Sequence, residues 1–236
     1  MADQVVAQRV RWWRRPWVAP LFVVVAVFLA FSVPRYLTFD PARSRMPDPG
    51  VSWHYPVLVA HVLFASVAML TGCLQVWPHF RQRFPHVHRY LGRVYVFGGV
   101  FPAGVSGFAI GVVSPFGPLN QVSNTMLAVL WLGCTVAALR TARQRRFGEH
   151  RRWMVRSFAL TMSIISNRLW GIVVGLWLEP QLHTTFQGSE IALGQAVAGL
   201  SAWLGWTVPL LFAEWWLQRG RKKPSARPVR HAVAVG

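Results

Sequence analysis

Long apolar stretches alternate with short polar segments along most of the chain. Six stretches have the length and hydrophobicity of membrane-spanning helices; they cover residues 17–33, 53–77, 91–113, 122–139, 157–178 and 191–217. The hydrocarbon core of a bilayer is about 30 Å thick and takes roughly 20 apolar residues per helix. The pattern therefore predicts an all-α, polytopic membrane bundle with six transmembrane helices, of which the second to fifth form a four-helix core.

The polar segments carry the positive charge in an alternating arrangement. All but four of the 25 Lys and Arg residues lie before the first stretch, around the junctions of stretches two and three and of four and five, or after the sixth. Because positive loops stay on the cytoplasmic side, both termini are predicted to be cytoplasmic. Basic segments at 1–16 and 218–236 then flank a membrane domain at 17–217. The 23 Arg against 2 Lys are typical of high-GC bacterial genomes, which favours a bacterial plasma (inner) membrane.

Composition and charge narrow the class of protein further. The chain of 236 residues is 53% hydrophobic and only 14% charged, whereas soluble domains are about a quarter charged. Its hydrophobicity also excludes a disordered chain. A net charge of +18 would ordinarily indicate nucleic-acid binding. Here the charges sit in short clusters between apolar runs, so the expected partner is the lipid bilayer and not nucleic acid. Two cysteines exclude a disulfide scaffold.

Two basic loops resemble each other in sequence. Residues 81–89 align without gaps on 143–151, with five of nine positions identical at an offset of 62 residues. Each segment leads into the next stretch, so stretches two–three and four–five are predicted to be equivalent hairpins. Small and polar residues also recur at helical spacing on stretches two, three and five, which predicts that these faces point inward. His88 and His150 would then lie at equal depth on equivalent helices.

His88 and His150 are candidate ligands of a b-type haem. Diagonal helices of an antiparallel bundle have axes roughly 11–14 Å apart, which suits two imidazoles reaching the axial positions of one haem iron. Nearby arginines, among them Arg93 and Arg156, would receive the haem propionates. The alternative is that both histidines only cap helices or reach the membrane surface. Two further histidines, at 79 and 86, would serve as extra ligands of a plain metal ion.

Arg168 and His61 are predicted to line a second, outward pocket. Arg168 lies about 12 residues inside the fifth stretch, where a charge is costly unless it is paired or hydrated, and no acidic residue of the other stretches lies near that depth. His61 lies at a similar depth on the second stretch and, as a neutral imidazole, accepts a hydrogen bond or binds a metal. The alternatives are an arginine satisfied by carbonyls, Asn167 and water, and a histidine that bonds to a neighbouring helix.

The sequence has His61 in an early span, the string HRYLGRVY at 88–95 and the string HRRWMVRS at 150–157. Together these three features resemble a bacterial multi-pass membrane family of unknown function. The resemblance covers roughly residues 55–180 and implies a membrane protein without implying an activity. More loosely, paired histidines on alternate spans resemble the cytochrome b561 and ferric-reductase proteins, which implies haem ligation. His61 lacks a histidine partner at its depth, so this likeness implies at most one bis-histidine haem.

The sequence leaves three classes of function open. The first is a redox protein with one haem b between His88 and His150, passing electrons to a quinone or other lipophilic acceptor beside His61 and Arg168. The second is a cofactor-free intramembrane enzyme that acts on a lipophilic substrate. The third is a transporter or assembly factor without chemistry, although paired broken helices are expected of a transporter and only the third stretch has an obvious Gly/Pro break. Motifs of ATPases, esterases, zincins and dinucleotide-binding enzymes are absent from the sequence.

Overall fold

The structure is a computed structural model that describes residues 17–44 and 46–219. The basic segment at 1–16 and most of the basic tail at 218–236 lie outside these residues. Within the described part the regular elements are all helical. They are α1 (Val18–Ser32), the 3-10 turn η2 (Pro41–Arg43), α2 (His54–Val76), α3 (Pro78–Arg83), α4 (Pro85–Arg93), the π-helical segment η3 (Val94–Val100), α5 (Phe101–Val112), α6 (Pro118–Arg143), α7 (Phe147–Thr161), α8 (Ser163–Leu178), the 3-10 turn η4 (Glu179–Gln181) and α9 (Glu190–Arg219).

These helices confirm the predicted helical membrane bundle and revise its spans. In the described part, 4 helical stretches are long and apolar enough to cross a bilayer: α2, the continuous α4–η3–α5, α6 and α9. A fifth results if α7 and α8 count as one span, bent by 43°. The first predicted span is shorter than expected, because α1 has 15 residues. At 1.5 Å per residue that is about 22 Å, less than the hydrocarbon core.

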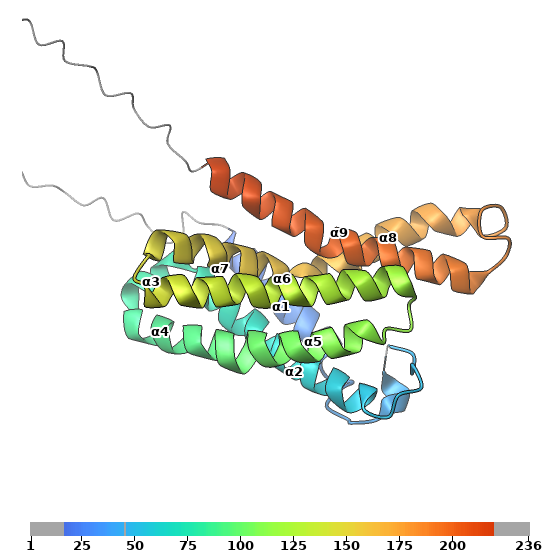
Figure 1. Cartoon of the computed structure of the whole chain (residues 1–236), viewed down its shortest axis with the longest axis horizontal. Helices are drawn as coiled ribbons and strands as arrows, with labels where there is room; N and C mark the ends of the chain where they lie inside the picture. The colour runs from blue at the N-terminus through green and yellow to red at the C-terminus, as the bar shows by residue number, and fades with distance from the viewer. Residues whose placement is uncertain (1–16, 45, 220–236) are drawn as a thin grey trace, which may run out of the picture.

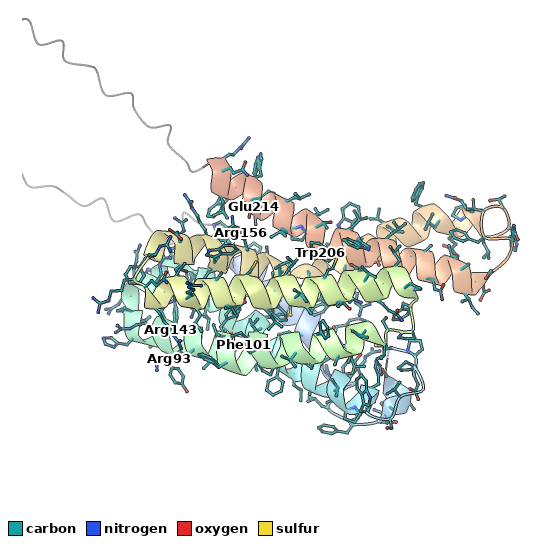
Figure 2. All side chains as sticks on the ribbon, viewed as in Figure 1. Arg93, Phe101, Arg143, Arg156, Trp206 and Glu214 are labelled. Atoms are coloured by element: carbon teal, nitrogen blue, oxygen red, sulfur yellow. The ribbon has the colours of Figure 1, made fainter. Side chains whose placement is uncertain are left out.

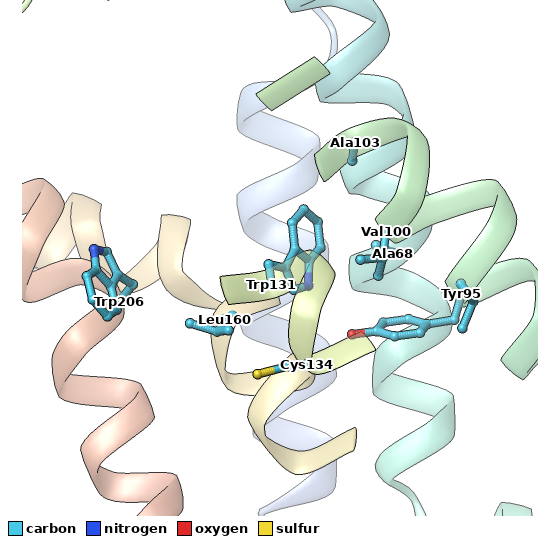
Figure 3. Close-up of a cluster of buried hydrophobic side chains, with 9 residues drawn as sticks. Ala68, Tyr95, Val100, Ala103, Trp131, Cys134, Leu160 and Trp206 are labelled. Carbon is cyan, nitrogen blue, oxygen red and sulfur yellow. The ribbon is translucent and has the colours of Figure 1, made fainter. Parts of the chain in front are cut away.

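The predicted four-helix core is also confirmed. Helices α2 and α6 each pack against both α5 and α7, so α5 and α7 lie diagonally across the bundle. Helix α9 packs along α8, α6 and α7, and α1 lies against α2 (Figure 1). The centre of this core is a cluster that includes Tyr95, Val100, Trp131 and Leu160 (Figure 3).

The two ends of the bundle differ in charge. One end holds α3, the turn between α6 and α7, and the last turns of α9, and it carries most of the described arginines (Figures 1 and 2). We refer to it as the arginine-rich end. The opposite end holds the connections at 33–44, 46–53, 113–117 and 179–189. Spans that start at one end finish at the other, as an alternating arrangement of loops requires.

The helices of the third and fifth spans each contain one irregularity, a π-helical segment before α5 and a bend between α7 and α8. In the segment η3 the backbone N–H of Phe101 bonds to the carbonyl of Val96, five residues earlier, and Pro102 follows directly. A π turn of this kind inserts an extra residue into an α-helix and is frequent at functional sites. The bend between α7 and α8 lies beside Thr161, whose hydroxyl donates to the carbonyl of Ser157 at 2.8 Å. Such hydrogen bonds to the preceding turn bend helices.

Candidate functional site

A cavity of about 290 Å³ lies between α1, α2, α5, α6 and α8, and His61 and Arg168 both line it. Its volume is close to the lower end of the range of about 300–1,000 Å³ for small-molecule sites. Most of the wall is apolar, with side chains such as Leu58, Met69 and Ile110. Two residues 107 positions apart in the sequence therefore contribute polar groups to one apolar chamber.

His61 presents a defined ring nitrogen. Its Nδ1 lies 2.8 Å from the carbonyl oxygen of Ala103 on α5, and since a carbonyl only accepts, Nδ1 carries the hydrogen. The neutral ring then has its lone pair on Nε2, which makes that atom an acceptor. Gly107 provides the space for the ring, because a Cβ at this position would lie 2.9 Å from the imidazole Cε1. The backbone of α5 thus fixes both the tautomer and the position of His61.

Arg168 is the one charged residue on the described wall of the cavity, and its side chain is exposed. From the sequence, the Arg168 guanidinium was expected to be buried inside the bundle. This expectation was wrong, because the side chain is exposed in the structure. The inward face of α7 includes the buried Ser157 and Thr161, but the 43° bend turns α8 outward after Met162. Arg168 consequently lies where the wall meets the surface of the helix bundle, with Asn167 beside it on the same wall.

A cluster of hydroxyl groups lies beneath the cavity at the centre of the four-helix core. The Tyr95 hydroxyl lies 2.7 Å from that of Ser157 and 2.9 Å from that of Thr161, which also accepts from Trp131 Nε1 at 3.0 Å. Thr135 lies 2.8 Å from Ser157 and donates to the carbonyl of Trp131. Trp131 and Thr161 also line the cavity, so this buried network reaches its floor. Figure 3 shows the Tyr95 phenol pointing across the core toward Trp131.

Tyr95 and Ser157 belong to the faces of the third and fifth stretches that were predicted to point inward, but the sequence analysis did not predict that they bond to each other. A pattern in the sequence pointed to the contact: Tyr95 and Ser157 follow His88 and His150 by the same seven residues and are separated by the offset of 62. Equivalent positions of the two predicted hairpins therefore meet across the core at this level.

His88 on α4 and His150 on α7 both lie at the arginine-rich end. Both are half-buried. The Nδ1 of His150 lies 2.9 Å from the carbonyl of Ala138 on α6, which leaves Nε2 as its second ring nitrogen. His88 has a buried Nδ1 with no hydrogen-bond partner, while Gln75 on α2 donates to its backbone carbonyl. Neither histidine lines the cavity that contains His61.

The two additional histidines do not join this pair. Among the described residues there is no group of three or more His, Cys, Asp or Glu arranged to hold a metal ion. His79 and His86 are exposed, and His86 Nδ1 accepts from the Arg89 guanidinium at 3.0 Å. A plain metal ion held by several of these histidines is therefore not supported by their arrangement.

The two arginines expected near haem propionates have different surroundings. Arg93 is exposed on α4 at the arginine-rich end. Arg156 forms a two-point ion pair with Glu214 on α9 and lies over the Trp153 ring at 4.6 Å (Figure 2). This pair was missed because its members are 58 residues apart and no sequence periodicity connects them. The carboxylate of Glu214 occupies the Nε and Nη2 edge of the guanidinium, where a propionate would form two parallel hydrogen bonds.

Comparison with known proteins identifies a family for this chain but assigns no activity to it. The model of a family described as a predicted membrane protein (DUF2306) matches residues 58–217, which include α5 to α8 and nearly all of α2 and α9. The matched region contains His61, His88, His150 and Arg168. No curated protein and no solved structure matches the chain.

Proposed function

This chain belongs to the DUF2306 family of predicted membrane proteins, and we propose that it binds a lipophilic small molecule in the cavity lined by His61 and Arg168. A multi-pass membrane protein of this kind sits in a lipid bilayer, so an apolar ligand can reach it through the hydrocarbon phase. The observation that carries the proposal is the convergence of one imidazole and one guanidinium on a chamber that is otherwise mostly apolar.

The two polar groups define the chemistry of the ligand. Nε2 of His61 accepts a hydrogen bond, and the Arg168 guanidinium donates hydrogen bonds and carries a positive charge. A ligand with an apolar body and an oxygen-bearing head, whose carbonyl faces Arg168 and whose hydroxyl faces His61, matches both groups. A quinol matches both groups, because one hydroxyl can donate to Nε2 of His61 and the oxygen of the other can accept from Arg168. Its oxidised form, the quinone, offers carbonyl oxygens to Arg168 alone and is a lipophilic electron acceptor.

Direct binding of a short-chain quinol to the full-length protein in detergent, under reducing conditions, tests the proposal. We expect that His61→Leu and Arg168→Gln each weaken binding about tenfold, since a lost hydrogen bond to a ligand contributes roughly 1–1.5 kcal/mol. His183→Ala is the matched control, because His183 is exposed and does not line the cavity. Equal affinities of wild-type protein and both cavity variants would refute the proposed ligand site.

A second pair of variants tests the cavity without removing a polar group. Gly107→Ala places a Cβ 2.9 Å from the His61 ring and should displace it into the chamber, whereas a Cβ at Gly133 meets nothing within 4 Å. We expect weaker quinol binding for Gly107→Ala and unchanged binding for Gly133→Ala. The reverse order would contradict the position assigned to the ligand.

We also propose a b-type haem between His88 and His150 as a second function at the arginine-rich end. Two observations support it: Tyr95 and Ser157, which follow the two histidines by seven residues each, are in contact, and the Nδ1 of His150 is held by a carbonyl. Haem-ligating histidines use Nε2 while Nδ1 bonds to a carbonyl or carboxylate. Arg93 remains in place for a propionate, whereas Arg156 is paired with Glu214. A bound haem would supply one-electron transfer.

An absorbance spectrum of protein purified from haem-supplemented cells tests this second proposal. The expected result is a Soret band that His88→Ala and His150→Ala both abolish and that the distant His183→Ala retains. A wild-type protein without the band, or a band that survives both substitutions, would exclude a bis-histidine haem at this position.

We further propose that the arginine-rich end faces the cytoplasm of a bacterial cell, with the protein in the plasma membrane. The excess of arginine at one end supports this orientation. The two native cysteines are buried, so cysteines introduced at exposed positions are readily distinguished. A membrane-impermeant maleimide added to intact cells should label Thr184→Cys and not Gln144→Cys. Labelling in the opposite order would invert the orientation.

A further inference from the structure

A second cavity, of about 870 Å³, lies at the arginine-rich end between the first turns of α7 and the last turns of α9. Four arginines line it: Arg146, Arg151, Arg152 and Arg219. The one acidic residue on its described wall is Glu149, and it is paired with Arg146. In the part of the chain that the structure describes, no carboxylate lies within ion-pair distance of the other three guanidinium groups. The cleft therefore has a strong excess of positive charge.

Tryptophans hold two of these arginines at the mouth of the cleft. The guanidinium of Arg219 lies 3.8 Å from the ring centre of Trp215, and that of Arg151 lies 5.5 Å from the ring centre of Trp216. Stacking on an aromatic face orients the planar guanidinium and leaves its N–H groups directed along the plane. Both tryptophans are about half exposed and also line the cleft. The arginines are thus positioned before any anion arrives.

The place of the cleft in the bundle indicates where its anion comes from. Trp215 and Trp216 lie near the end of a membrane-spanning helix, and tryptophan is enriched at the level of lipid headgroups. A cleft open at this level, with basic side chains from two spans, is a typical binding place for anionic lipid headgroups. Arginine recognises phosphate oxygens through two parallel hydrogen bonds.

We propose that this cleft binds the phosphodiester headgroup of an anionic phospholipid, with Arg151, Arg152 and Arg219 contacting the phosphate oxygens and Trp215 and Trp216 contacting the glycerol and the first methylenes. The site is independent of the cavity that contains His61, since no residue lines both. It attaches the end of α9 to the start of α7 through a lipid, beside the direct ion pair of these two helices.

The test uses the full-length protein in detergent, with phosphatidylglycerol, phosphatidylcholine or inorganic phosphate added at equal concentration. Native mass spectrometry counts retained lipid, and thermal unfolding reports stabilisation. Phosphatidylglycerol should bind and stabilise, and phosphatidylcholine should not. The triple variant Arg151→Gln/Arg152→Gln/Arg219→Gln should lose roughly 100-fold in affinity for phosphatidylglycerol, at about fivefold for each arginine near a lipid surface.

A matched variant distinguishes binding in the cleft from a general attraction of anionic lipid to positive charge. Arg81→Gln/Arg140→Gln/Arg143→Gln removes the same charge from exposed positions at the same end but outside the cleft. It should retain phosphatidylglycerol as the wild type does. Equal losses in both triple variants would overturn a specific site, and stabilisation by inorganic phosphate alone would overturn the lipid as its source.

Two measurements keep the proposal testable if the triple variant does not fold. The single variant Arg219→Gln should weaken phosphatidylglycerol binding about fivefold. With the wild-type protein, added salt should release phosphatidylglycerol because exposed charges are screened. Salt-independent retention together with an unaffected Arg219→Gln would overturn the proposal.

Discussion

Two helices of the core approach each other closely at Gly99, and replacing this glycine tests the packing that supports the site. A Cβ at Gly99 would lie 2.9 Å from both Cα and Cβ of Ala68 and 3.0 Å from its backbone nitrogen. Because carbon atoms pack at about 3.5–4.0 Å, α2 and the π segment would have to separate by at least about 0.6 Å. Gly98, the neighbouring residue, offers the control: a Cβ there meets only Val94 Cγ1, at 3.6 Å.

The two substitutions make the same chemical change at adjacent positions and differ in what the new Cβ contacts. Both exchange glycine for alanine in the same helical segment, so the gain in helix propensity, about 1 kcal/mol or less, cancels in the comparison. Overpacking in a core costs about 1–3 kcal/mol. Gly99→Ala should therefore unfold about 1–3 kcal/mol more easily than Gly98→Ala. Gly98→Ala itself should be neutral or slightly more stable than the wild type.

Reversible unfolding in mixed detergent micelles, followed by circular dichroism, measures this difference. A thermal midpoint is a second measurement, with about 2–4 °C per kcal/mol expected for a chain of this size. If Gly99→Ala is as stable as Gly98→Ala, α2 and the π segment are not in contact at Ala68. The arrangement of the core derived from that contact would then be wrong.

Three further predictions follow from other contacts. Tyr95→Phe removes a fully buried hydroxyl with two hydroxyl partners and should cost about 1–2 kcal/mol in the same unfolding measurement; an unchanged stability would show that the hydroxyl cluster does not form. Glu214→Gln leaves the partly buried Arg156 without its carboxylate and should cost about 1–3 kcal/mol, whereas the double variant Arg156→Gln/Glu214→Gln should recover part of that loss. Cys73 and Cys134 are buried thiols, so both should react with a maleimide only after unfolding, and rapid labelling of folded protein would contradict the packing of α2 and α6.

The spans were largely predictable from the sequence because the bilayer imposes a length on each apolar run. The ends of the helices were less so: α7 begins at Phe147, although the hydropathy pattern began the fifth span at residue 157. Arg151 and Arg152 lower the hydropathy of these first turns but do not disturb backbone hydrogen bonding, and their side chains are exposed at the arginine-rich end. The helix therefore begins about ten residues before the apolar segment that hydropathy detects.

The site was predictable in its depth and unpredictable in its contacts. Counting residues from the ends of the spans placed His61 and Arg168 at one level, and both line one cavity. A straight fifth helix would place Arg168 on the inward face, and the bend near Met162 places it at the surface instead. No glycine or proline lies near Met162, so the sequence does not indicate the bend. The bond from His61 to Ala103 depends on how α2 and α5 pack, which no local pattern encodes.

In the π-helical segment Val94–Val100, the number of residues determines the direction in which the following helix, α5, presents its side chains. One extra residue in an α-helix turns everything after it by about 100°. Deleting a single residue from the segment would rotate α5 by that angle and carry the Ala103 carbonyl away from His61, toward the surface of the bundle. The length of this stretch is thus constrained in addition to its side chains at Tyr95 and Gly99, and insertions or deletions there should be the most damaging of any in the chain's third span.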